Sequence, residues 1–524
     1  MIKRVPKFYG NVKINNRLPT YELLSKLNIV SHPSSGFVNW SSIGLLIEHK
    51  ISNLIRKHLN SIHGEEVKLS LISNKELWER TGRWENTEIF KLDNDKLLVP
   101  TSEEQITDHV DKNLKSYKEL PILLYQINTK FRNEKRPRGG LLRGKEFLMN
   151  DGYSFDIDEK NAMKSYNSIV EAYHKIFTDL RVPYIKANAD SGDIGGDLSH
   201  EWHYIDKTGE DLVFTCDSCG NISNIEKTLS IGESQYDVDV KYFTTNDRNT
   251  LICAYYPKGR ILEPKFIKSE LELPEDLIET TDLTEFSDIS KRVIRIMDSR
   301  LTSRSNFPDF PIDFVNRSLI TTLTDIPIVL AQEGETCHEC EEGKLNSSPA
   351  IEVGHTFYLG DKYSKPMNCK IDIPEGNKTK SVNLMMGCYG IGISRIIAAI
   401  AEINRDEQGL RWPSIISPWN ITIVSKDHYD FIKTLDFDYR LDDRDENFSK
   451  KINLSNSLGI PLIVILGRSF PICEIEIRGK LYSQSWKEQY PKLKDKYQWT
   501  VNNGKHFVHK DGLTSIVNIL LNDM

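Results

Sequence analysis

Apolar residues recur with helical spacing in two long stretches of the chain. In residues 41–60 they occupy positions 43, 45, 46, 47, 51, 54, 55 and 59. This pattern predicts a helix with a wide apolar face, whose first turn Ser41 or Ser42 can cap. Residues 159–180 predict a second amphipathic helix, which ends before Val182-Pro183.

Shorter apolar stretches between these helices predict strands. They are Val67–Ile72, Lys96–Val99, Leu123–Phe131 and Glu146–Met149. The segments that link them are often short and turn-like, which favours an antiparallel sheet over one built with crossover helices.

In the remainder of the chain, the composition and the predicted elements change at two places. Residues 225–345 are rich in Ser, Thr, Asp and Glu, with strand-like islands such as Thr250–Tyr256, and we interpret them as an inserted module. Residues 383–403 predict a strand, a glycine-rich turn and a helix, and from Pro413 onward strands and helices alternate. The expected fold class is α/β (α+β): an antiparallel sheet flanked by helices, an insertion and a C-terminal α/β domain.

Charge is distributed unevenly along the 524 residues, which suffice for about three domains. The net charge of −7 argues against a protein that binds its partners through a basic surface alone. Residues 1–30 hold six Lys or Arg residues against the single acid Glu22, a net charge of +5. Such a segment is typical of a mitochondrial transit segment, and the alternative is a solvated basic tail. No apolar run reaches the roughly 18 residues of a membrane span, so no membrane partner is expected.

Arginines concentrate in one predicted hairpin. Residues 131–147 read FRNEKRPRGGLLRGKEF, a strand followed by a basic Pro/Gly loop and a returning strand. Guanidinium groups bind phosphate and carboxylate through two parallel hydrogen bonds, which makes the hairpin a candidate anion site. The alternative is a solvated basic hairpin.

A glycine-rich stretch, residues 386–395, reads MGCYGIGISR. Its glycines allow a ligand to approach the backbone closely, and the alternative is a helix packing site that tolerates glycine. A dinucleotide site is rejected because no long parallel βαβ unit with a later ribose-binding acid is present.

With these two stretches the chain resembles class II aminoacyl-tRNA synthetases, and among them the prolyl enzymes of the bacterial and organellar type. Residues 131–156 resemble motif 2 of that family, and residues 386–395 resemble motif 3. Further similar stretches are PTSEE (100–104), EVGH (352–355), LGDKYS (359–364), DDR (442–444) and GIP (459–461). The resemblance extends from about residue 31 to 524 and is weakest in the insertion.

The resemblance implies a domain division. It consists of a leader, a catalytic domain in two parts that an insertion separates, and an anticodon-binding domain. The boundaries are 1–30, 31–224, 225–345, 346–412 and 413–524.

The resemblance also implies ATP-dependent ligation of L-proline to tRNA(Pro) through a prolyl-adenylate, with ATP and Mg²⁺ as substrate. In an in-line attack on a phosphate, the protein contributes by positioning the reactants and by placing positive charges near the phosphate oxygens. The implied catalytic residues are Arg132 and Arg395. The implied ATP-binding residues are Arg132, Glu134, Arg143, Phe147, Glu352 and Arg395. The implied proline-binding residues are Thr101, Glu103, Arg132, Glu201, His355 and Cys388, with Ser199 and His200 beside them.

Two basic regions are the expected tRNA contacts. The resemblance places the hairpin residues Lys135, Arg136 and Arg138 near the acceptor end. Residues 470–510 hold eight Lys or Arg residues against four acids, which makes Lys492, Lys494 and Lys496 candidate anticodon-side contacts. The aromatic residues Tyr490, Tyr497 and Trp499 lie among them and either stack on unpaired bases or belong to the core.

The chain departs from the family in two places. Ser42, within Trp40–Gly44, stands where family members usually carry a proline in motif 1, the motif that builds the dimer interface. We still expect a homodimer, with its geometry left open. Relatives often hold an editing domain in the insertion, because binding alone discriminates small apolar side chains poorly. No editing motif is found in residues 225–335, which predicts a reduced insertion without effective editing.

Two Cys-x-x-Cys pairs, Cys216 with Cys219 and Cys337 with Cys340, flank the insertion. If the ends of the insertion lie close together, four thiolates converge, the number that suits a tetrahedral structural zinc ion. The alternative is two unmetallated pairs, because the gap of 117 residues is far outside ordinary zinc-ribbon spacing. His338 is a spare ligand.

Rival functions are a synthetase-like pseudoenzyme and a threonine-specific synthetase. The first is expected to lose charged active-site residues, which this chain retains, and the second needs zinc-binding His and Cys in its catalytic core. A free-standing anticodon-binding module is excluded by length. The basic N-terminus favours the mitochondrial matrix, with the cytoplasm as the alternative.

Overall fold

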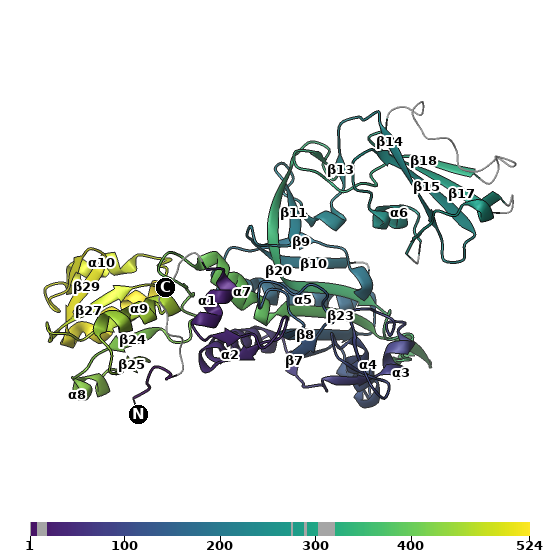
Figure 1. The fold of residues 1–524 in the computed structure, drawn as a ribbon. Coiled ribbons are helices and arrows are strands. Elements are labelled where there is room, and N and C mark those ends of the chain that lie inside the picture. Colours follow the sequence, from purple (N-terminus) through teal and green to yellow (C-terminus); the bar gives the residue numbers. More distant parts are fainter. Residues whose placement is uncertain (1, 8–17, 197, 274–275, 288–290, 302–319) are drawn as a thin grey trace. The chain divides into compact units, whose positions relative to one another are not determined.

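The fold is that of a computed structural model, which describes residues 2–7, 18–196, 198–273, 276–287, 291–301 and 320–524 (Figure 1). The chain forms two compact units. The first comprises residues 1–184, 193–197 and 353–524, and the second comprises residues 185–192 and 198–352. Strand β20 (Leu345–Gly360) contributes to both. None of the described helices is long and apolar enough to cross a membrane.

An antiparallel sheet in the first unit carries the arginine hairpin. Its strands, in spatial order, are the second half of β20, β23 (Met385–Gly392), β8 (Glu146–Asp156), β7 (Ile122–Phe131) and the short parallel edge strand β3 (Glu65–Glu66). The register of the hairpin is continuous from Ile122 opposite Phe155 to Phe131 opposite Glu146. The predicted antiparallel sheet is therefore confirmed.

Two strand predictions need correction. β8 continues seven residues beyond the predicted end at Met149, and all seven are buried although several are polar, so apolar alternation does not mark them. The predicted strand Val67–Ile72 is wrong for most of its length. The chain does follow β7 there, but the Gln126 side chain, instead of a strand neighbour, accepts the Leu69 N–H at 3.0 Å.

Three helices cover this sheet. α5 (Glu159–Asp179) packs on β8 and β23, α2 (Ser42–Asn60) packs on α5, and α7 (Ile393–Asn404) packs on β8 (Figure 1). Both predicted long helices are confirmed. The Ser41 hydroxyl caps α2 by accepting the Ile43 and Gly44 N–H groups at 3.2 and 3.3 Å, so Ser42 becomes the first residue of the helix.

The other elements of this part of the chain are short. They are α1 (Thr20–Lys26), β1 (Val30–Ser31), β2 (Asn39–Trp40), β4 (Ile72–Asn74), α3 (Lys75–Arg80), β5 (Phe90–Leu92), β6 (Lys96–Leu98), α4 (Glu103–Asn113), β21 (Lys370–Glu375) and β22 (Lys378–Asn383).

Residues 20–30, predicted to belong to the leader, are folded. Leu23, Leu24, Leu27 and Ile29 are buried, and α1 packs on α7. A cut at residue 30 would remove these side chains from the core of the first unit. Residues 3–5 are also ordered, since the Val5 N–H donates to Leu441 O at 3.0 Å.

The predicted alternation of strands and helices is confirmed from β24 onward, in the part of the chain that the sequence predicts to be the C-terminal α/β domain. Its strands lie in the order β25 (Arg440–Asp442), β24 (Ile421–Val424), β26 (Leu462–Ile465), β27 (Ile472–Ile477), β29 (Lys505–His509) and β28 (Thr500–Asn502). Its helices are α8 (Tyr429–Lys433), α9 (Phe448–Leu458), α10 (Ser485–Leu493) and α11 (Leu513–Asn522). Trp499 belongs to the core of this domain, where its indole N–H donates to His506 Nδ1 at 3.0 Å. Base stacking by Trp499 is therefore excluded.

The described residues of the second unit form two larger sheets. One has the order β10 (Leu198–Ile205), β9 (Ile185–Asn188), β12 (Ile222–Asn224), β11 (Asp211–Cys216) and the first part of β20. The other has the order β16 (Ile278–Glu279), β14 (Val238–Thr244), β15 (Thr250–Pro257), β17 (Arg292–Asp298) and β18 (Ile320–Ile326), with α6 (Pro264–Glu270) beside it. The short strands β13 (Ser230–Ile231) and β19 (Thr336–Cys337) pair with each other.

The predicted strand island in the insertion is confirmed as β15. Alternate residues of β15 enter two separate apolar clusters, with Ile252 in one and Leu251 in the other. The polar insertion is thus a sheet with a buried core on each face.

Candidate active site

Glu103 lies at the centre of a buried polar cluster in the first unit. It is the first residue of α4, and its side chain is fully buried. Its Oε1 accepts hydrogen bonds from Thr101 Oγ1 at 2.7 Å and from Cys388 Sγ at 3.1 Å. Its Oε2 lies 3.0 Å from Arg83 Nη1. Three predicted proline-binding residues, Thr101, Glu103 and Cys388, are therefore in direct contact.

A second layer of buried groups holds this cluster against β8. The Ser102 N–H donates to the Tyr153 hydroxyl at 2.9 Å, and that hydroxyl donates to Asp151 Oδ2 at 2.9 Å. Asp151 in turn lies 2.8 Å from Lys130 Nζ. Each buried charge in this layer has an opposite charge beside it, which offsets the cost of removing both from water. The network fixes the loop that carries Thr101.

The two adjacent carboxyl groups of the cluster have pKa values that are shifted in opposite directions. Arg83 Nη1 also lies 3.0 Å from Glu104 Oε1. Burial acts to raise the pKa of Glu103, but Arg83 and the hydrogen bonds from Thr101 and Cys388 outweigh it, so the pKa lies below the ordinary value. For Glu104, burial together with the negative charge of Glu103 prevails over Arg83 and raises the pKa to about 7. Carboxyl groups with pKa values driven apart are typical of functional sites.

The arginine hairpin is held together by its own backbone. The Arg132 N–H donates to Lys145 O at 2.9 Å, and Arg138 and Arg143 exchange N–H···O bonds of 3.1 and 3.2 Å. Gly139 and Gly140 both have positive φ, +62° and +63°, at the tip, which glycine adopts at no steric cost. The Arg132 guanidinium lies 5.3 Å from the centroid of the Phe147 ring. The loop residues Lys135, Arg136 and Arg138 are exposed, as expected for contacts with a large partner.

Glu134 and Arg143, both predicted to bind ATP, are paired with each other. Arg143 Nε donates to Glu134 Oε2 at 2.6 Å, and the Arg136 N–H donates to Glu134 Oε1 at 2.9 Å. Burial opposes ionisation, but these hydrogen bonds prevail and lower the pKa of Glu134. Glu134 is thus an ionised acceptor with a fixed orientation.

Motif 3 joins the hairpin through α7. Arg395 Nε donates to Leu142 O at 2.9 Å, and the Leu148 N–H donates to Ser394 Oγ at 2.9 Å. The predicted glycine turn is wrong, because β23 runs through all the glycines to Gly392 and α7 begins at the next residue. Gly387 is required sterically, since a Cβ there would lie 2.0 Å from the Tyr389 hydroxyl.

Glu201, predicted to bind proline, and Glu352, predicted to bind ATP, lie in the second unit. Burial and the neighbouring Glu352 carboxylate raise the pKa of Glu201 to about 9. Glu201 Oε2 accepts a hydrogen bond from Asn224 Nδ2 at 2.8 Å. Ser199 and His200 lie beside it on β10. His355 lies in the first unit, opposite Gly390 on β23, with its ring stacked on Phe357 at a centroid distance of 3.8 Å.

The basic stretch of the C-terminal domain is partly neutralised. Lys492, Lys494 and Lys496 are exposed around the end of α10. By contrast, Arg478 is buried and paired with Asp406, and Lys505 is paired with Glu474 and Glu476. The local charge counted along the sequence therefore overstates the basic surface.

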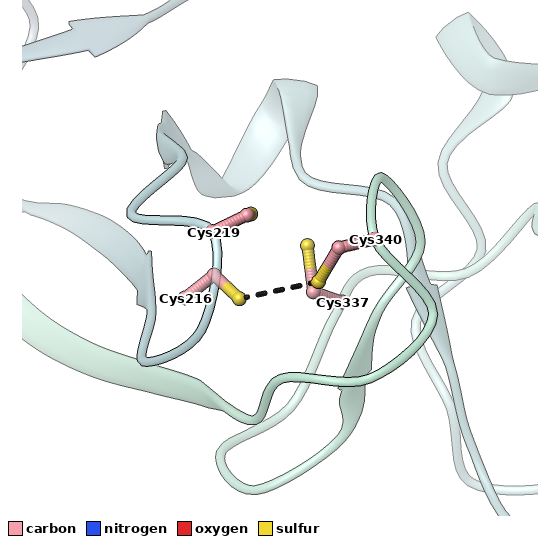
Figure 2. Close-up of side chains that lie close together, drawn as sticks. All are labelled: Cys216, Cys219, Cys337 and Cys340. Atoms are coloured by element: carbon pink, nitrogen blue, oxygen red, sulfur yellow. Dashed lines mark hydrogen bonds between the residues drawn. The ribbon is translucent and has the colours of Figure 1, made fainter.

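The four predicted cysteine ligands come together in the second unit, with their sulfur atoms within 4.8 Å of one another (Figure 2). Among the described residues this group consists of Cys216, Cys219, Cys337 and Cys340, so His338 is not part of it.

Arg83 is a site residue that no motif in the sequence predicts. It follows Gly82 in a turn after α3, and its guanidinium lies 4.8 Å from the Trp78 ring and 5.5 Å from the Tyr363 ring. The only signal in the sequence is an arginine between a glycine and a tryptophan. Its two carboxylate partners are about 20 residues away along the chain, so only the fold reveals the contact.

The glycine-bearing strand β23 leads into α7, and Arg395 of α7 is hydrogen-bonded to the arginine hairpin of the antiparallel sheet. This arrangement identifies the chain as a class II aminoacyl-tRNA synthetase. In agreement, the tRNA synthetase class II core domain (G, H, P, S and T) matches residues 87–404. The solved prolyl-tRNA synthetase from Cryptosporidium parvum, complexed with L-proline and AMP, shares the fold with a TM-score of 0.58 at 13% identity. That match covers 96% of this chain and 74% of the other.

Closer relatives identify the particular family. The chain is 57% identical to the cytoplasmic proline--tRNA ligase of Candida albicans, over 100% of this chain and 98% of that one. It is 39% identical to a probable mitochondrial proline--tRNA ligase of Saccharomyces cerevisiae, over 99% of this chain and 97% of that one. The chain belongs to the proline--tRNA ligase family of class II aminoacyl-tRNA synthetases, which confirms the family predicted from its motifs.

Proposed function

We propose that this chain ligates L-proline to tRNA(Pro) through a prolyl-adenylate, using ATP with Mg²⁺. The observation that carries the proposal is the buried, ionised Glu103 with Thr101 bonded to it. The secondary ammonium group of proline offers two N–H donors. The Glu103 carboxylate can accept a hydrogen bond from one of these N–H groups. The Thr101 hydroxyl donates its own proton to Glu103, so its oxygen can still accept a hydrogen bond from the second N–H group.

Cys388 closes the same cluster from β23. Because its thiol donates to Glu103 at 3.1 Å, it lowers the pKa of the carboxyl and adds a small apolar surface beside it. We assign Arg132, His355 and Glu201 as the further proline contacts, on the strength of the motif matches. The raised pKa of Glu201 makes it a neutral hydrogen-bond donor at pH 7.

Adenylate formation joins a proline carboxylate oxygen to the α-phosphorus and breaks the bond from that phosphorus to the bridging oxygen, so pyrophosphate leaves. The charge that develops on the phosphate oxygens needs fixed cations. Arg132 and Arg395 are the proposed catalytic residues. Both are anchored to the hairpin, Arg132 through its backbone and Arg395 through its side chain, so little reorganisation is needed at the moment of reaction.

The hairpin also supplies the nucleotide contacts that we propose. Phe147 presents a ring on which adenine can stack, and the ionised Glu134 accepts a hydrogen bond from the adenine amino group. Arg143 orients Glu134, and we assign it a phosphate contact as well, on the strength of the motif match. Glu352 supplies a carboxylate oxygen, the ligand type that Mg²⁺ prefers. The zinc ion predicted for the four cysteines has no role in this chemistry.

For tRNA, we propose that Lys135, Arg136 and Arg138 contact the acceptor end and that Lys492, Lys494 and Lys496 contact the anticodon side. All six are exposed. Separate basic contacts on a net acidic protein suit a product that must dissociate after each turnover.

We further propose a homodimer that works in the mitochondrial matrix. The resemblance of Trp40–Gly44 to motif 1, the motif that builds the dimer interface in this class, supports the dimer. The basic N-terminus supports the location, and cleavage at residue 30 is not expected, because residues 20–30 are packed in the first unit. Light scattering should give twice the chain mass of 60.3 kDa, and fractionation of cells that express the tagged full chain should place it in mitochondria. A monomer, or a purely cytosolic chain, would refute the respective part.

The central test is pyrophosphate exchange with ATP, measured with proline, with threonine and with no amino acid. We expect exchange with proline alone. Arg132→Ala should lower it by about 10²–10³-fold, because the transition state then lacks an anchored cation. The matched control is Arg80→Ala, which removes an exposed arginine on α3 and should leave exchange unchanged. Exchange with threonine, or with no amino acid at all, would refute the proposal.

A further inference from the structure

Two turns that lie far apart in the sequence bring four cysteine sulfurs into one cluster in the second unit (Figure 2). Cys216 Sγ lies 3.7 Å from Cys340 Sγ. A disulfide would require about 2.05 Å. Tetrahedral zinc with Zn–S bonds of about 2.3 Å requires sulfurs about 3.8 Å apart. The observed separation is therefore that of two ligands on one metal ion, without a bond between them.

The two turns have the same backbone geometry. In the first, the Gly220 N–H donates to Cys216 O at 3.2 Å, and in the second, the Glu341 N–H donates to Cys337 O at 2.9 Å. The residue after each second cysteine has positive φ, +69° at Gly220 and +59° at Glu341. A glutamate rarely adopts this backbone conformation, so the second turn contains local backbone strain at Glu341.

This shape directs backbone donors toward sulfur. The Gly343 N–H lies 3.4 Å from Cys340 Sγ, and a donated hydrogen bond favours a thiolate over a thiol. Gly343 also permits the close approach of the two turns, since a Cβ at this position would lie 2.4 Å from Cys216 Sγ.

The turns are fastened together independently of any ion. The Lys344 N–H donates to Asp217 Oδ1 at 2.7 Å, and the Asp217 N–H donates to Lys344 O at 3.1 Å. Cys216 is paired in register with Leu345, and Cys337 with Ser230. Cys216 and Cys337 are buried in a small apolar cluster, whereas Cys219 is exposed. The ligand set is thus largely preformed, with one cysteine open to solvent.

We infer that Cys216, Cys219, Cys337 and Cys340 bind one structural zinc ion. Four sulfur ligands select a soft or borderline metal over Mg²⁺ or Ca²⁺, and four protein ligands leave no open position for catalysis. Each thiol that binds as thiolate releases its proton. The ion joins the two ends of the segment between Cys219 and Cys337, so it closes the base from which the five-stranded sheet of the insertion extends. The inference does not depend on the proposed function.

Metal analysis of the full chain, purified without chelator, tests the inference. We expect about one zinc ion per chain. Cys216→Ser combined with Cys340→Ser should reduce the content to less than about a tenth, because only two of the four thiolate ligands remain. The matched control is Cys253→Ser, which replaces a buried cysteine of β15 outside the cluster and should keep the full content.

A milder variant guards against misfolding. Cys219→Ser changes an exposed side chain, so the chain should fold and keep its proline-dependent exchange. After reconstitution with Co²⁺, the wild type should show the intense sulfur-to-cobalt absorption and visible bands of a tetrahedral thiolate site, and Cys219→Ser should show them shifted and weakened. A wild type without zinc, a double variant with full zinc content, iron in place of zinc, or a disulfide within either pair would each overturn the inference.

Discussion

Arg83 Nη1 lies 3.0 Å from Glu103 Oε2, where the carboxylate is fully buried. The same nitrogen lies 3.0 Å from Glu104 Oε1. One guanidinium therefore serves both carboxyl groups, and the hydrogen bonds from Thr101 and Cys388 favour the charged form of Glu103 over that of Glu104. Arg83 contacts Glu103, the residue proposed to bind proline, and has no proposed contact with proline itself. We therefore regard Arg83 as a positioning residue.

Replacing Arg83 should weaken proline binding through Glu103. In Arg83→Met, burial no longer has an opposing cation, so the pKa of Glu103 should rise and the carboxyl should become neutral near pH 7. Removing one partner of a buried ion pair lowers the free energy of unfolding by about 3–5 kcal/mol. The neutral carboxyl also loses its charge-assisted hydrogen bond to the ammonium group of proline, so we expect the KM for proline to rise by about 10²-fold. The measurement is the pH dependence of kcat/KM for proline in pyrophosphate exchange, whose acidic limb should move to higher pH.

Arg83→Lys is the matched control, because it keeps the positive charge and should restore part of the activity at neutral pH. A folded Arg83→Met variant with an unchanged pH profile would show that Arg83 is merely structural.

Glu104→Gln should stabilise the protein at alkaline pH. The pKa of Glu104 is raised from 4.5 to about 7, so the folded state holds a proton that the unfolded state has already released. Between these values the stability of the wild type should fall as pH rises. Glutamine cannot ionise, and the variant should lose this component of the pH dependence. Denaturant unfolding of both proteins at pH 5 and pH 8 measures it. An equal stability difference between the two proteins at both pH values would contradict the assignment.

Protonation of His506 should weaken the C-terminal domain in acid. Burial lowers the pKa of His506 from 6.5 to about 4, and His506 Nδ1 accepts the Trp499 indole N–H, which a protonated ring cannot do. The unfolded state takes up the proton first, so stability present above pH 6.5 should decline as pH falls toward 4. His506→Asn keeps an acceptor but not the titration. We expect a flatter pH profile for this variant in tryptophan-monitored unfolding, and identical profiles would reject the explanation.

The exposed lysines near α10 should act on tRNA and not on adenylate formation. A triple replacement of Lys492, Lys494 and Lys496 by alanine should raise the KM for tRNA(Pro). It should also lower the slope of the salt dependence of binding by about one for each phosphate that a lysine no longer neutralises. Exchange in the absence of tRNA should not change. The control is Lys433→Ala, an exposed lysine on α8 of the same domain. An unchanged KM for tRNA in the triple variant would place the tRNA-binding surface elsewhere.

The insertion should not edit. We expect alanyl-tRNA(Pro) to be hydrolysed in the presence of the enzyme no faster than prolyl-tRNA(Pro), measured as release of labelled amino acid. The prediction rests on the lack of a recognisable editing motif, although residues 302–319 lie outside the described part of the insertion. Rapid and selective release of alanine would show that the five-stranded sheet carries an editing site.

Several features of the fold were predictable because they depend on neighbours along the chain. The helix of residues 42–60 follows from apolar periodicity and a serine cap, and the hairpin follows from two strands that flank a Pro/Gly loop. The alternation of strands and helices after residue 413 likewise depends on local pattern. Prediction was less successful where polar residues are buried, as in the second half of β8, because burial on both faces removes the alternation that marks a strand.

The sequence by itself determined the family, the hairpin that carries Arg132 and the occurrence of four cysteines as two pairs. Each of these features depends on a motif of residues that are adjacent in the sequence. Only the tertiary structure decided that Arg83 holds Glu103, that Trp499 belongs to the core, and that the cysteine pairs meet at 3.7 Å across a gap of 117 residues. The physical reason is that electrostatic coupling, burial and metal geometry depend on distance in space, and that distance is set by packing between segments remote in the chain.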